Sequence, residues 1–126
     1  MSPARWRTMR RSFVELIVDI RAEAGHTVLA VTGEIDIHTA HTLRDRLADV
    51  VAAGARTLIV DLGGVEFLDS SGLSVLVGGL NEVRDVGGSL SLVCPHANLL
   101  KLFAITGLDQ VFVIHPTVAA AIAHAP

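Results

Sequence analysis

Cysteine is almost absent from this 126-residue chain, which contains Cys94 and no other cysteine. A single cysteine cannot form an internal disulfide, and it cannot supply a Cys-x-x-Cys pair for metal binding or redox chemistry. Cys94 follows an apolar segment and precedes Pro95. A cysteine in that setting is typical of a small buried hydrophobic residue, so we expect Cys94 to be structural.

Long apolar runs are also lacking. No segment approaches the run of about 20 apolar residues that a membrane-spanning helix needs. The charged start of the chain is not followed by the apolar core of a signal peptide. We therefore expect a cytoplasmic protein without membrane association. The apolar share of 51% is sufficient at this length for the core of one domain.

Basic residues are few outside the first eleven positions. Four of the ten basic residues are Arg5, Arg7, Arg10 and Arg11, which leaves six basic against thirteen acidic residues over 12–126, a net charge of −7. We predict a flexible basic arm over residues 1–11 and one acidic domain over 12–126. An acidic domain is a poor nucleic-acid binder, so we expect no direct nucleic-acid contact. An arm that touches nucleic acid or an acidic partner is the alternative.

Sequence motifs for nucleotide binding and hydrolysis are missing. The chain has no Gly-x-x-x-x-Gly-Lys-Ser/Thr loop, no Gly-x-Gly-x-x-Gly segment after the first strand and no Gly-x-Ser-x-Gly elbow. His38 and His41 have helical spacing, but no acidic or cysteine third ligand stands at a suitable distance. We therefore predict no cofactor, no metal and no enzyme activity. A hydrolase triad of Ser71, Asp69 and a distant histidine stays open as an alternative.

Apolar periodicity predicts an α/β fold, with a mixed, mainly parallel sheet of about five strands packed with about four helices. The first two strands should form an antiparallel hairpin, and the strands expected are 13–20, 26–31, 57–62, 89–93 and 111–114. Helices are expected over 40–51, 70–83, 99–103 and 117–123. Strands that alternate with helices are typical of right-handed βαβ units, so the remaining strands should be parallel.

The tetrapeptide Asp69-Ser70-Ser71-Gly72, called here the serine corner, lies where a strand leads into a helix. The strand at 57–62 is followed by Gly63-Gly64, which predicts a turn, and then by a loop. The first N–H groups of a helix have no partner within the helix, and the helix dipole is positive there. The serine corner is therefore suited to a capping side chain or to a phosphate. These four residues alone leave both interpretations open.

Several segments of the chain stand in a distinctive order and spacing. They are Gly33-Glu34-Ile35-Asp36, the run LGGVEFLDSSGL from Leu62 to Leu73, Gly87-Gly88, and the run LFAITGL from Leu102 to Leu108. Together they resemble the STAS-domain family, in particular the bacterial anti-sigma factor antagonists. The resemblance spans residues 13–123, and it implies a single STAS-like domain that acts as a protein-binding switch.

The resemblance also implies a phosphorylation cycle. Unphosphorylated antagonists of this kind bind an anti-sigma factor that is a serine/threonine kinase, and the sigma factor is thereby freed for RNA polymerase. The kinase phosphorylates the antagonist in its Asp-Ser-Ser/Thr-Gly motif, and a PP2C-type phosphatase resets it. Carried onto this chain, the phosphoacceptor is expected at Ser71, with Ser70 as the alternative. Asp69 is expected to orient the acceptor hydroxyl or to cap the helix.

One predicted partner surface runs along the helix that begins at the serines. Helical spacing from Ser71 places a stripe of small, nearly uncharged residues outside the apolar face: Ser74, Val75, Gly78 and Glu82. Asp69 and Gly72 belong to the same predicted surface. The helix also contains Gly78-Gly79, and a helical glycine costs about 1 kcal/mol relative to alanine. Close approach of a partner or of another helix would offset that cost.

A second predicted partner surface is the loop after the second strand. The resemblance implies that this loop lies near the serines, so Glu34, Asp36 and His38 are expected to meet basic groups on the kinase. The alternative is that Gly33 and Asp36 only shape the turn and cap the next helix. We expect a monomer or a weak dimer.

Three classes of function remain. The first is the antagonist switched by serine phosphorylation. The second is a STAS module without a kinase cycle, such as a scaffold subunit or a lipid-transport accessory protein. The third is the small serine hydrolase.

Overall fold

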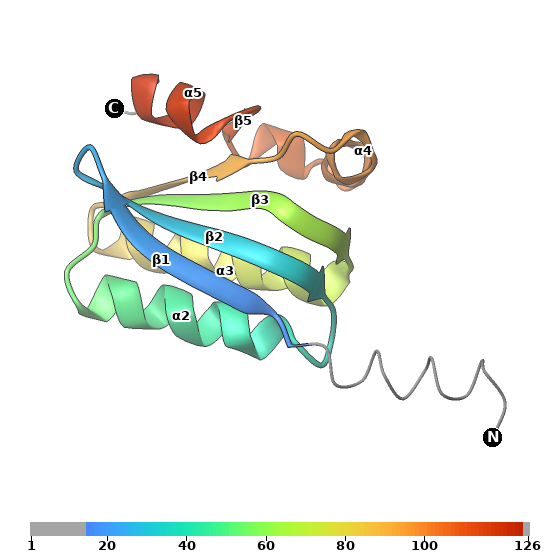
Figure 1. Ribbon diagram of the computed structural model, residues 1–126, viewed down its shortest axis with the longest axis horizontal. Helices are drawn as coiled ribbons and strands as arrows, with labels where there is room; N and C mark the ends of the chain where they lie inside the picture. The colour runs from blue at the N-terminus through green and yellow to red at the C-terminus, as the bar shows by residue number, and fades with distance from the viewer. Residues whose placement is uncertain (1–14, 125–126) are drawn as a thin grey trace, which may run out of the picture.

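The computed structural model describes residues 15–124 (Figure 1), so the predicted basic arm over 1–11 lies outside the described residues. The elements follow in the order β1 (Ile17–Glu23), β2 (His26–Ile35), α2 (Ala40–Ala52), β3 (Thr57–Leu68), α3 (Ser70–Asp85), β4 (Ser89–Val93), α4 (Ala97–Ile105), the 3-10 helix η1 (Leu108–Gln110), β5 (Ile114–His115) and α5 (Val118–Ala123).

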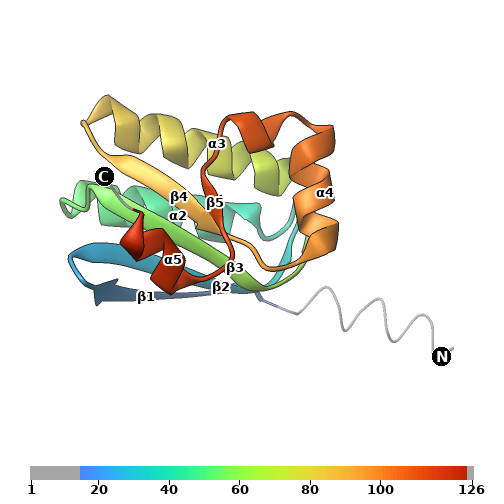
Figure 2. The ribbon, with the colours of Figure 1, turned by 90° about the horizontal axis from the view of Figure 1, so that it is seen from above.

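The strands form one sheet in chain order, β1-β2-β3-β4-β5. Strand β1 is antiparallel to β2, and the pairs β2–β3, β3–β4 and β4–β5 are parallel, which confirms the predicted mixed, mainly parallel sheet. Helices α2 and α3 cover one face, and α5 lies on the other (Figure 1). Helix α4 lies beside the start of α3 (Figure 2). Within residues 15–124, no helix is long and apolar enough to cross a membrane.

The apolar core has a part on each face of the sheet. The larger part lies between the sheet and helices α2 and α3, and the smaller part, under α5, consists of Val28, Ile59, Val93 and Ala121. Neighbouring residues of a strand point to opposite faces. The consecutive apolar residues Leu58, Ile59 and Val60 of β3 therefore fill both parts, and each is at most 1% exposed. This is the pattern of a central strand in a sheet covered on both faces.

Strand β3 is longer than the sequence predicts, and the turn expected at Gly63-Gly64 is wrong. Both glycines lie inside β3, which continues to Leu68 with an irregular register against β2. The N–H of Gly63 donates to Oδ1 of Asp61 at 2.8 Å. A Cβ on Gly64 would lie 2.9 Å from the carbonyl oxygen of Val31. The glycines thus permit a bulge and a close approach of β2, a contact that local sequence does not reveal.

The two edge strands also differ from prediction. Strand β1 covers Ile17–Glu23 instead of 13–20, of which 13–14 lie outside the described residues. The strand expected over 111–114 is replaced by η1, an irregular segment and the short β5. The reason is Phe112, which is only 4% exposed and packs edge-to-face on Phe103 with ring centroids 6.1 Å apart. An extended strand from 111 would not bring this ring into the core.

Two local predictions are confirmed. Thr117 caps α5, because its Oγ1 accepts a hydrogen bond from the N–H of Ala120 at 3.0 Å. Cys94 is buried as expected, with 2% of its surface exposed. Burial raises the pKa of the Cys94 thiol, so the thiol stays in its unreactive neutral form.

Candidate functional site

The serine corner joins the end of β3 to the start of α3. Asp69 has an extended backbone, and its Oδ1 accepts hydrogen bonds from the N–H groups of Ser71 at 2.8 Å and Gly72 at 3.3 Å. Asp69 therefore caps α3, which is one of the two roles expected for it. The N–H of Asp69 donates to the carbonyl oxygen of Ile35 at 3.2 Å. That bond ties the serine corner to the end of β2.

The two serines of the corner differ in accessibility. Ser70 is exposed, whereas Ser71 is partly buried. Within residues 15–124 neither hydroxyl has a hydrogen-bond partner, so neither is paired with a histidine. The described residues also contain no group of three or more His, Cys, Asp or Glu side chains placed to hold a metal ion. Nothing in this geometry activates a serine as a nucleophile.

Gly72 has an internal position, not a surface position. A Cβ at Gly72 would overlap Cδ1 of Leu68 and would lie 2.7 Å from Cγ2 of Ile35. The absence of a side chain lets α3 begin directly against the ends of β2 and β3. The partner contact predicted at Gly72 is therefore corrected to a packing role.

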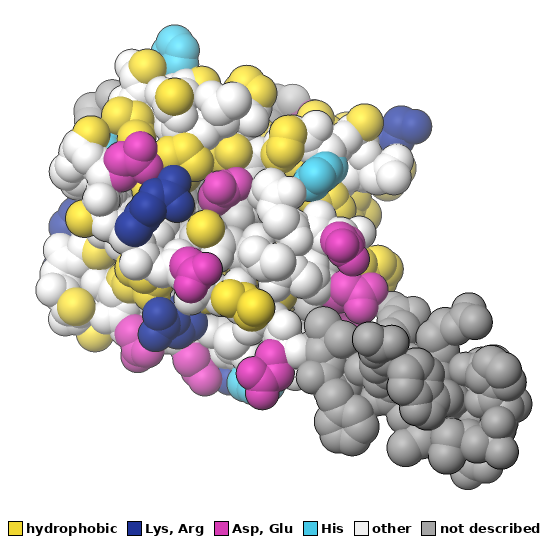
Figure 3. Space-filling view, in the orientation of Figure 1, with side chains coloured by type: hydrophobic (Ala, Val, Ile, Leu, Met, Phe, Trp, Pro, Cys, Tyr) yellow, Lys and Arg dark blue, Asp and Glu magenta, His cyan; other side chains and the backbone are white. Residues whose placement is uncertain are grey.

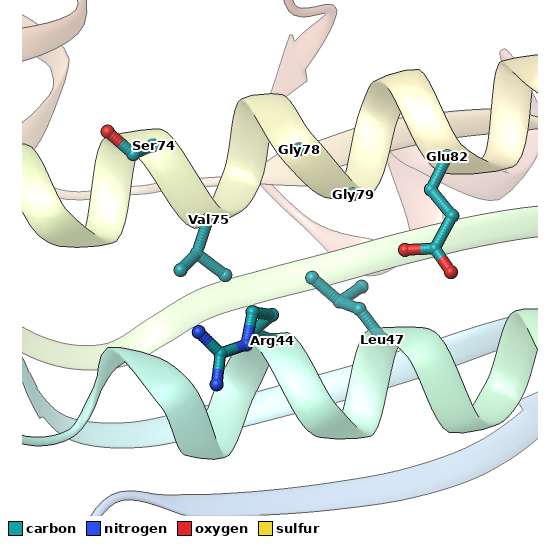
Figure 4. Close-up of a pocket in the computed structure, with 7 residues that line it drawn as sticks. All are labelled: Arg44, Leu47, Ser74, Val75, Gly78, Gly79 and Glu82. Atoms are coloured by element: carbon teal, nitrogen blue, oxygen red, sulfur yellow. The ribbon is translucent and has the colours of Figure 1, made fainter.

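The predicted stripe on α3 borders a groove of about 370 Å³ between α2 and α3. Seven residues line it: Arg44, Leu47, Ser74, Val75, Gly78, Gly79 and Glu82. Figure 4 shows Val75 and Glu82 of α3 pointing toward α2 and Leu47 of α2 pointing toward α3, while the side chain of Arg44 extends along α2 and Ser74 points away. All four stripe residues line this groove, and the structure adds Arg44 and Leu47 from α2 to the predicted surface.

The glycine pair in α3 serves two different purposes. A Cβ on Gly79 would lie 2.9 Å from Cδ1 of Leu47, so Gly79 allows α2 to pack closely. A Cβ on Gly78 would meet no atom within 4 Å. Gly78 is exposed and leaves a flat surface along the groove.

A second groove, of about 400 Å³, lies on the other side of α3. It is lined by Ser70, Leu73, Ser74, Val77, Thr106 and Leu108. The sequence did not predict one wall of this groove, which consists of Thr106 and Leu108. The neighbouring Ile105, which is 83% exposed, was not predicted as a partner residue either. The segment LFAITGL could have indicated it, because Ile105 falls outside the spacing of the buried Leu99 and Phe103.

The loop after β2 lies beside the serine corner, as predicted from the resemblance, because Ile35 pairs with Leu68 in the sheet. Oδ1 of Asp36 accepts hydrogen bonds from the N–H groups of His38 at 2.8 Å and Thr39 at 3.1 Å. Oγ1 of Thr39 donates to the carbonyl oxygen of Glu34 at 2.7 Å. Asp36 therefore shapes the turn before α2, as the structural alternative proposed. His38 is exposed and Glu34 is partly buried.

The surroundings of the serines are acidic. Segments 33–38 and 66–72 contain four acidic residues, Glu34, Asp36, Glu66 and Asp69, and no lysine or arginine. Figure 3 shows acidic side chains at the end of the molecule where β2 and β3 finish. A binding partner that approaches this end meets a field that favours basic groups.

Comparison with known proteins gives a consistent result. The family model of the STAS domain matches residues 18–121. The anti-sigma-B factor antagonist of Bacillus subtilis is 37% identical over 94 residues, which cover 75% of this chain and 85% of that protein.

Solved structures agree with these matches to the STAS domain and to anti-sigma factor antagonists. The crystal structure of an anti-sigma factor antagonist from Mycobacterium paratuberculosis superposes with a TM-score of 0.81 at 30% identity, covering 86% of this chain and 92% of that one. The Bacillus cell fate determinant SpoIIAA, solved in its phosphorylated form, has a TM-score of 0.67 at 25% identity, covering 87% of this chain and 100% of that one.

Proposed function

This chain belongs to the STAS-domain family, and we propose that it is an anti-sigma factor antagonist switched by phosphorylation of the serine corner. The observation that carries the proposal is an exposed serine, Ser70, at a capped helix start that borders a groove and an acidic loop. Its similarity to proteins named as anti-sigma factor antagonists supports the same function. The similarity to a protein solved in a phosphorylated form supports the switch.

In the proposed cycle the unphosphorylated protein binds an anti-sigma factor that is also a serine/threonine kinase. The sigma factor held by that kinase is then released to RNA polymerase. Phosphorylation ends the interaction, and a PP2C-type phosphatase restores it. The protein is in this view a regulator and not an enzyme, and it acts in the cytoplasm, where its proposed partners act, as a monomer or weak dimer.

The difference in accessibility favours Ser70 over Ser71 as the phosphoacceptor. A kinase must bring its phosphate donor in line with the acceptor oxygen. Ser70 is exposed and lines the groove between α3 and η1, whereas Ser71 is partly buried and does not line it. We therefore propose Ser70 as the main site, with Ser71, the site expected from sequence, as the alternative that the experiment below tests.

A phosphate at Ser70 would act on the partner surface through charge and hydration. It adds about −1.5 to −2 charges at neutral pH. Its oxygens would have to lose water inside any contact centred on the helix start, and Asp69 already places a negative charge there. The interface should lose several kcal/mol of binding free energy.

The same phosphate should leave the fold intact. The N–H groups of Ser71 and Gly72 already bond to Asp69, but the dipole of α3 still favours an anion at this end. Ser70 is exposed, so the phosphoryl group requires no cavity inside the protein. Phosphorylation should therefore abolish binding without unfolding the protein.

The proposed partner surface combines the α2/α3 groove with the loop after β2. Ser74, Val75 and Gly78 would supply a smooth contact along α3. Glu34, Asp36 and His38 would face the same partner at the end of β2. Because this end of the protein is acidic, the kinase should present lysine or arginine side chains to it.

The test is incubation of the full chain with its cognate anti-sigma kinase and ATP, followed by intact-mass analysis and phosphopeptide mapping. We expect a gain of one phosphate on Ser70, lost in Ser70→Ala and kept in Ser71→Ala. Modification that disappears only in Ser71→Ala would move the site to Ser71. No phosphate on either serine would contradict the proposed cycle and favour a STAS module without one.

A further inference from the structure

A pocket lined by several polar side chains lies at the opposite end of the molecule from the serines. It has a volume of about 160 Å³ and lies where β2, β3 and β4 begin and where α3 and α5 end. Its polar lining comes from His26, Arg84, His115 and His124, and from three hydroxyl residues. The proposed antagonist function uses none of these residues.

The sheet builds this pocket through its register. Val28, Ile59 and Val93 lie under α5, so residues two positions before them in the same strands face the same side. These residues are His26, Thr57 and Ser91, and Ser89 pairs directly with Thr57. A row of polar side chains therefore extends across β2, β3 and β4 beyond the apolar patch that α5 covers.

Two histidines close the pocket on the side of the last helix. His115 of β5 and His124 after α5 stack with ring planes 4° apart and centroids 5.7 Å apart. The ring of His26 is oriented by a hydrogen bond between its Nδ1 and the carbonyl oxygen of Ala24, at 2.9 Å. Since a carbonyl only accepts, Nδ1 carries the hydrogen, and Nε2 can donate to an anion only when the ring is the doubly protonated imidazolium.

The remaining polar groups of the pocket are unused. Within residues 15–124, no hydrogen bond or ion pair engages the guanidinium of Arg84 or the side-chain hydroxyls of Thr57, Ser89 and Ser91. Strand β5 pairs only with Leu92 and Val93 of β4. The first half of β4 thus has an open outer edge at this pocket.

The open edge also supplies a backbone donor. The N–H of Leu92 points outward and donates to the carbonyl oxygen of Val113 at 2.9 Å. Because N–H directions alternate along a strand, the N–H of Leu90 points to the same edge. Among residues 15–124, no strand pairs with β4 at that position to accept it.

The lining is suited to an anion. It contains one arginine, three histidines and three hydroxyl residues, and no aspartate or glutamate. Its apolar part comes from residues such as Leu80, Val113 and Ala121. Pockets for drug-sized ligands measure about 300–1,000 Å³, so this one takes a smaller molecule.

We infer that this pocket is a binding site for a small organic phosphate, held by Arg84, the histidines and the β4 hydroxyls, with a short apolar portion against Val113 and Ala121. Several donors around one centre match the three terminal oxygens of a phosphate monoester better than the two of a carboxylate. The site is separate from the switch: Arg84 stands about 21 Å along α3 from Ser70. The inference does not depend on the proposed function.

The experiment is an NMR titration of the unphosphorylated full chain with n-propyl phosphate, inorganic phosphate and butyrate. We expect saturable amide shifts over 89–91, 113–115 and 124, tightest with n-propyl phosphate. Arg84→Gln should weaken that binding about tenfold or more, since a charge-assisted hydrogen bond is lost. His115→Gln should weaken it less. Arg21→Gln, an exposed arginine on β1 paired with Glu23, removes the same charge and should change nothing.

Four outcomes would overturn the inference. They are the absence of saturable shifts over 89–91, shifts confined to residues 70–72 at the start of α3, equal affinity for n-propyl phosphate and butyrate, and unchanged affinity in Arg84→Gln. Circular dichroism of each variant verifies that it is folded. Because Ser70 and Ser71 stay unmodified in these samples, a negative result here says nothing about the phosphorylation switch.

Discussion

Helix α3 has two sides with very different surroundings. On the side that faces the sheet and α2, Gly72 and Gly79 stand where a Cβ would meet neighbouring side chains. On the outer side, Ser70, Ser74 and Gly78 are exposed and border the grooves. Small residues occur on both sides, yet those on the inner side permit close packing and those on the outer side leave a surface open to a partner.

The comparison shows why small residues alone do not define a binding surface. Gly78 and Gly79 are neighbours in sequence, and helical periodicity assigns them to different sides. The positions of Leu47 on α2 and Leu90 on β4 then give Gly79 its packing role, whereas Gly78 has no neighbour. Substitutions on the two sides of α3 should therefore differ in sign and in what they affect.

The largest effect on stability is expected at Gly72. Gly72→Val would force branched carbons against Leu68 and Ile35, and overpacking of a core costs about 1–3 kcal/mol and occasionally more. We expect a loss near 3 kcal/mol in the free energy of unfolding, measured by urea denaturation. A loss below 1 kcal/mol would mean that the inner side of α3 is not tightly packed.

The next effect is expected at the cap. Asp69→Ala removes the acceptor for the N–H groups of Ser71 and Gly72, which should cost about 1 kcal/mol of unfolding free energy. Asp69→Asn is the matched control, because asparagine caps helices about as well as aspartate. If the alanine and asparagine variants unfold at the same urea concentration, the capping role assigned to Asp69 is wrong.

The smallest effects are expected at the glycine pair, where one of the two alanine substitutions should stabilise the protein and the other should not. Gly78→Ala meets open space, so the higher helix propensity of alanine should stabilise the protein by up to about 1 kcal/mol. In Gly79→Ala the same gain is opposed by the contact with Leu47, so no net stabilisation is expected. Thermal unfolding of the two variants side by side decides the point. Equal stabilisation by both would remove the distinction between the two sides.

Much of this architecture could be predicted from the sequence because it depends on local pattern. The start of α3 followed from Asp69 and from the spacing of Leu73, Leu76 and Leu80, and β4 was predicted with its observed bounds. Helical spacing from Ser71 also predicted the residues of the stripe on α3 that line the α2/α3 groove. Such features are specified by residues that are close in the chain.

The errors arose where distant residues decide the structure. Gly63-Gly64 has the composition of a turn, but both residues lie inside β3, where Gly64 pairs closely with Thr32 of β2. The edge contact of Phe112 with Phe103 prevents the strand expected at 111. Likewise, the inward position of Gly72 depends on Leu68 and Ile35 together. The groove wall at Thr106 and Leu108 could not be predicted either, because it depends on the position of α4 beside α3.

The central claim is that one phosphate at the exposed start of α3 abolishes partner binding and leaves the fold intact. The most direct measurement compares the dissociation constant for the anti-sigma kinase, by calorimetry with ADP bound, between unphosphorylated protein and protein phosphorylated at Ser70. Thermal unfolding is recorded on the same two samples. We predict at least a hundredfold weaker binding, about 3 kcal/mol, with an unchanged unfolding temperature. Equal affinity of the two forms, or loss of binding that accompanies unfolding, would contradict the account.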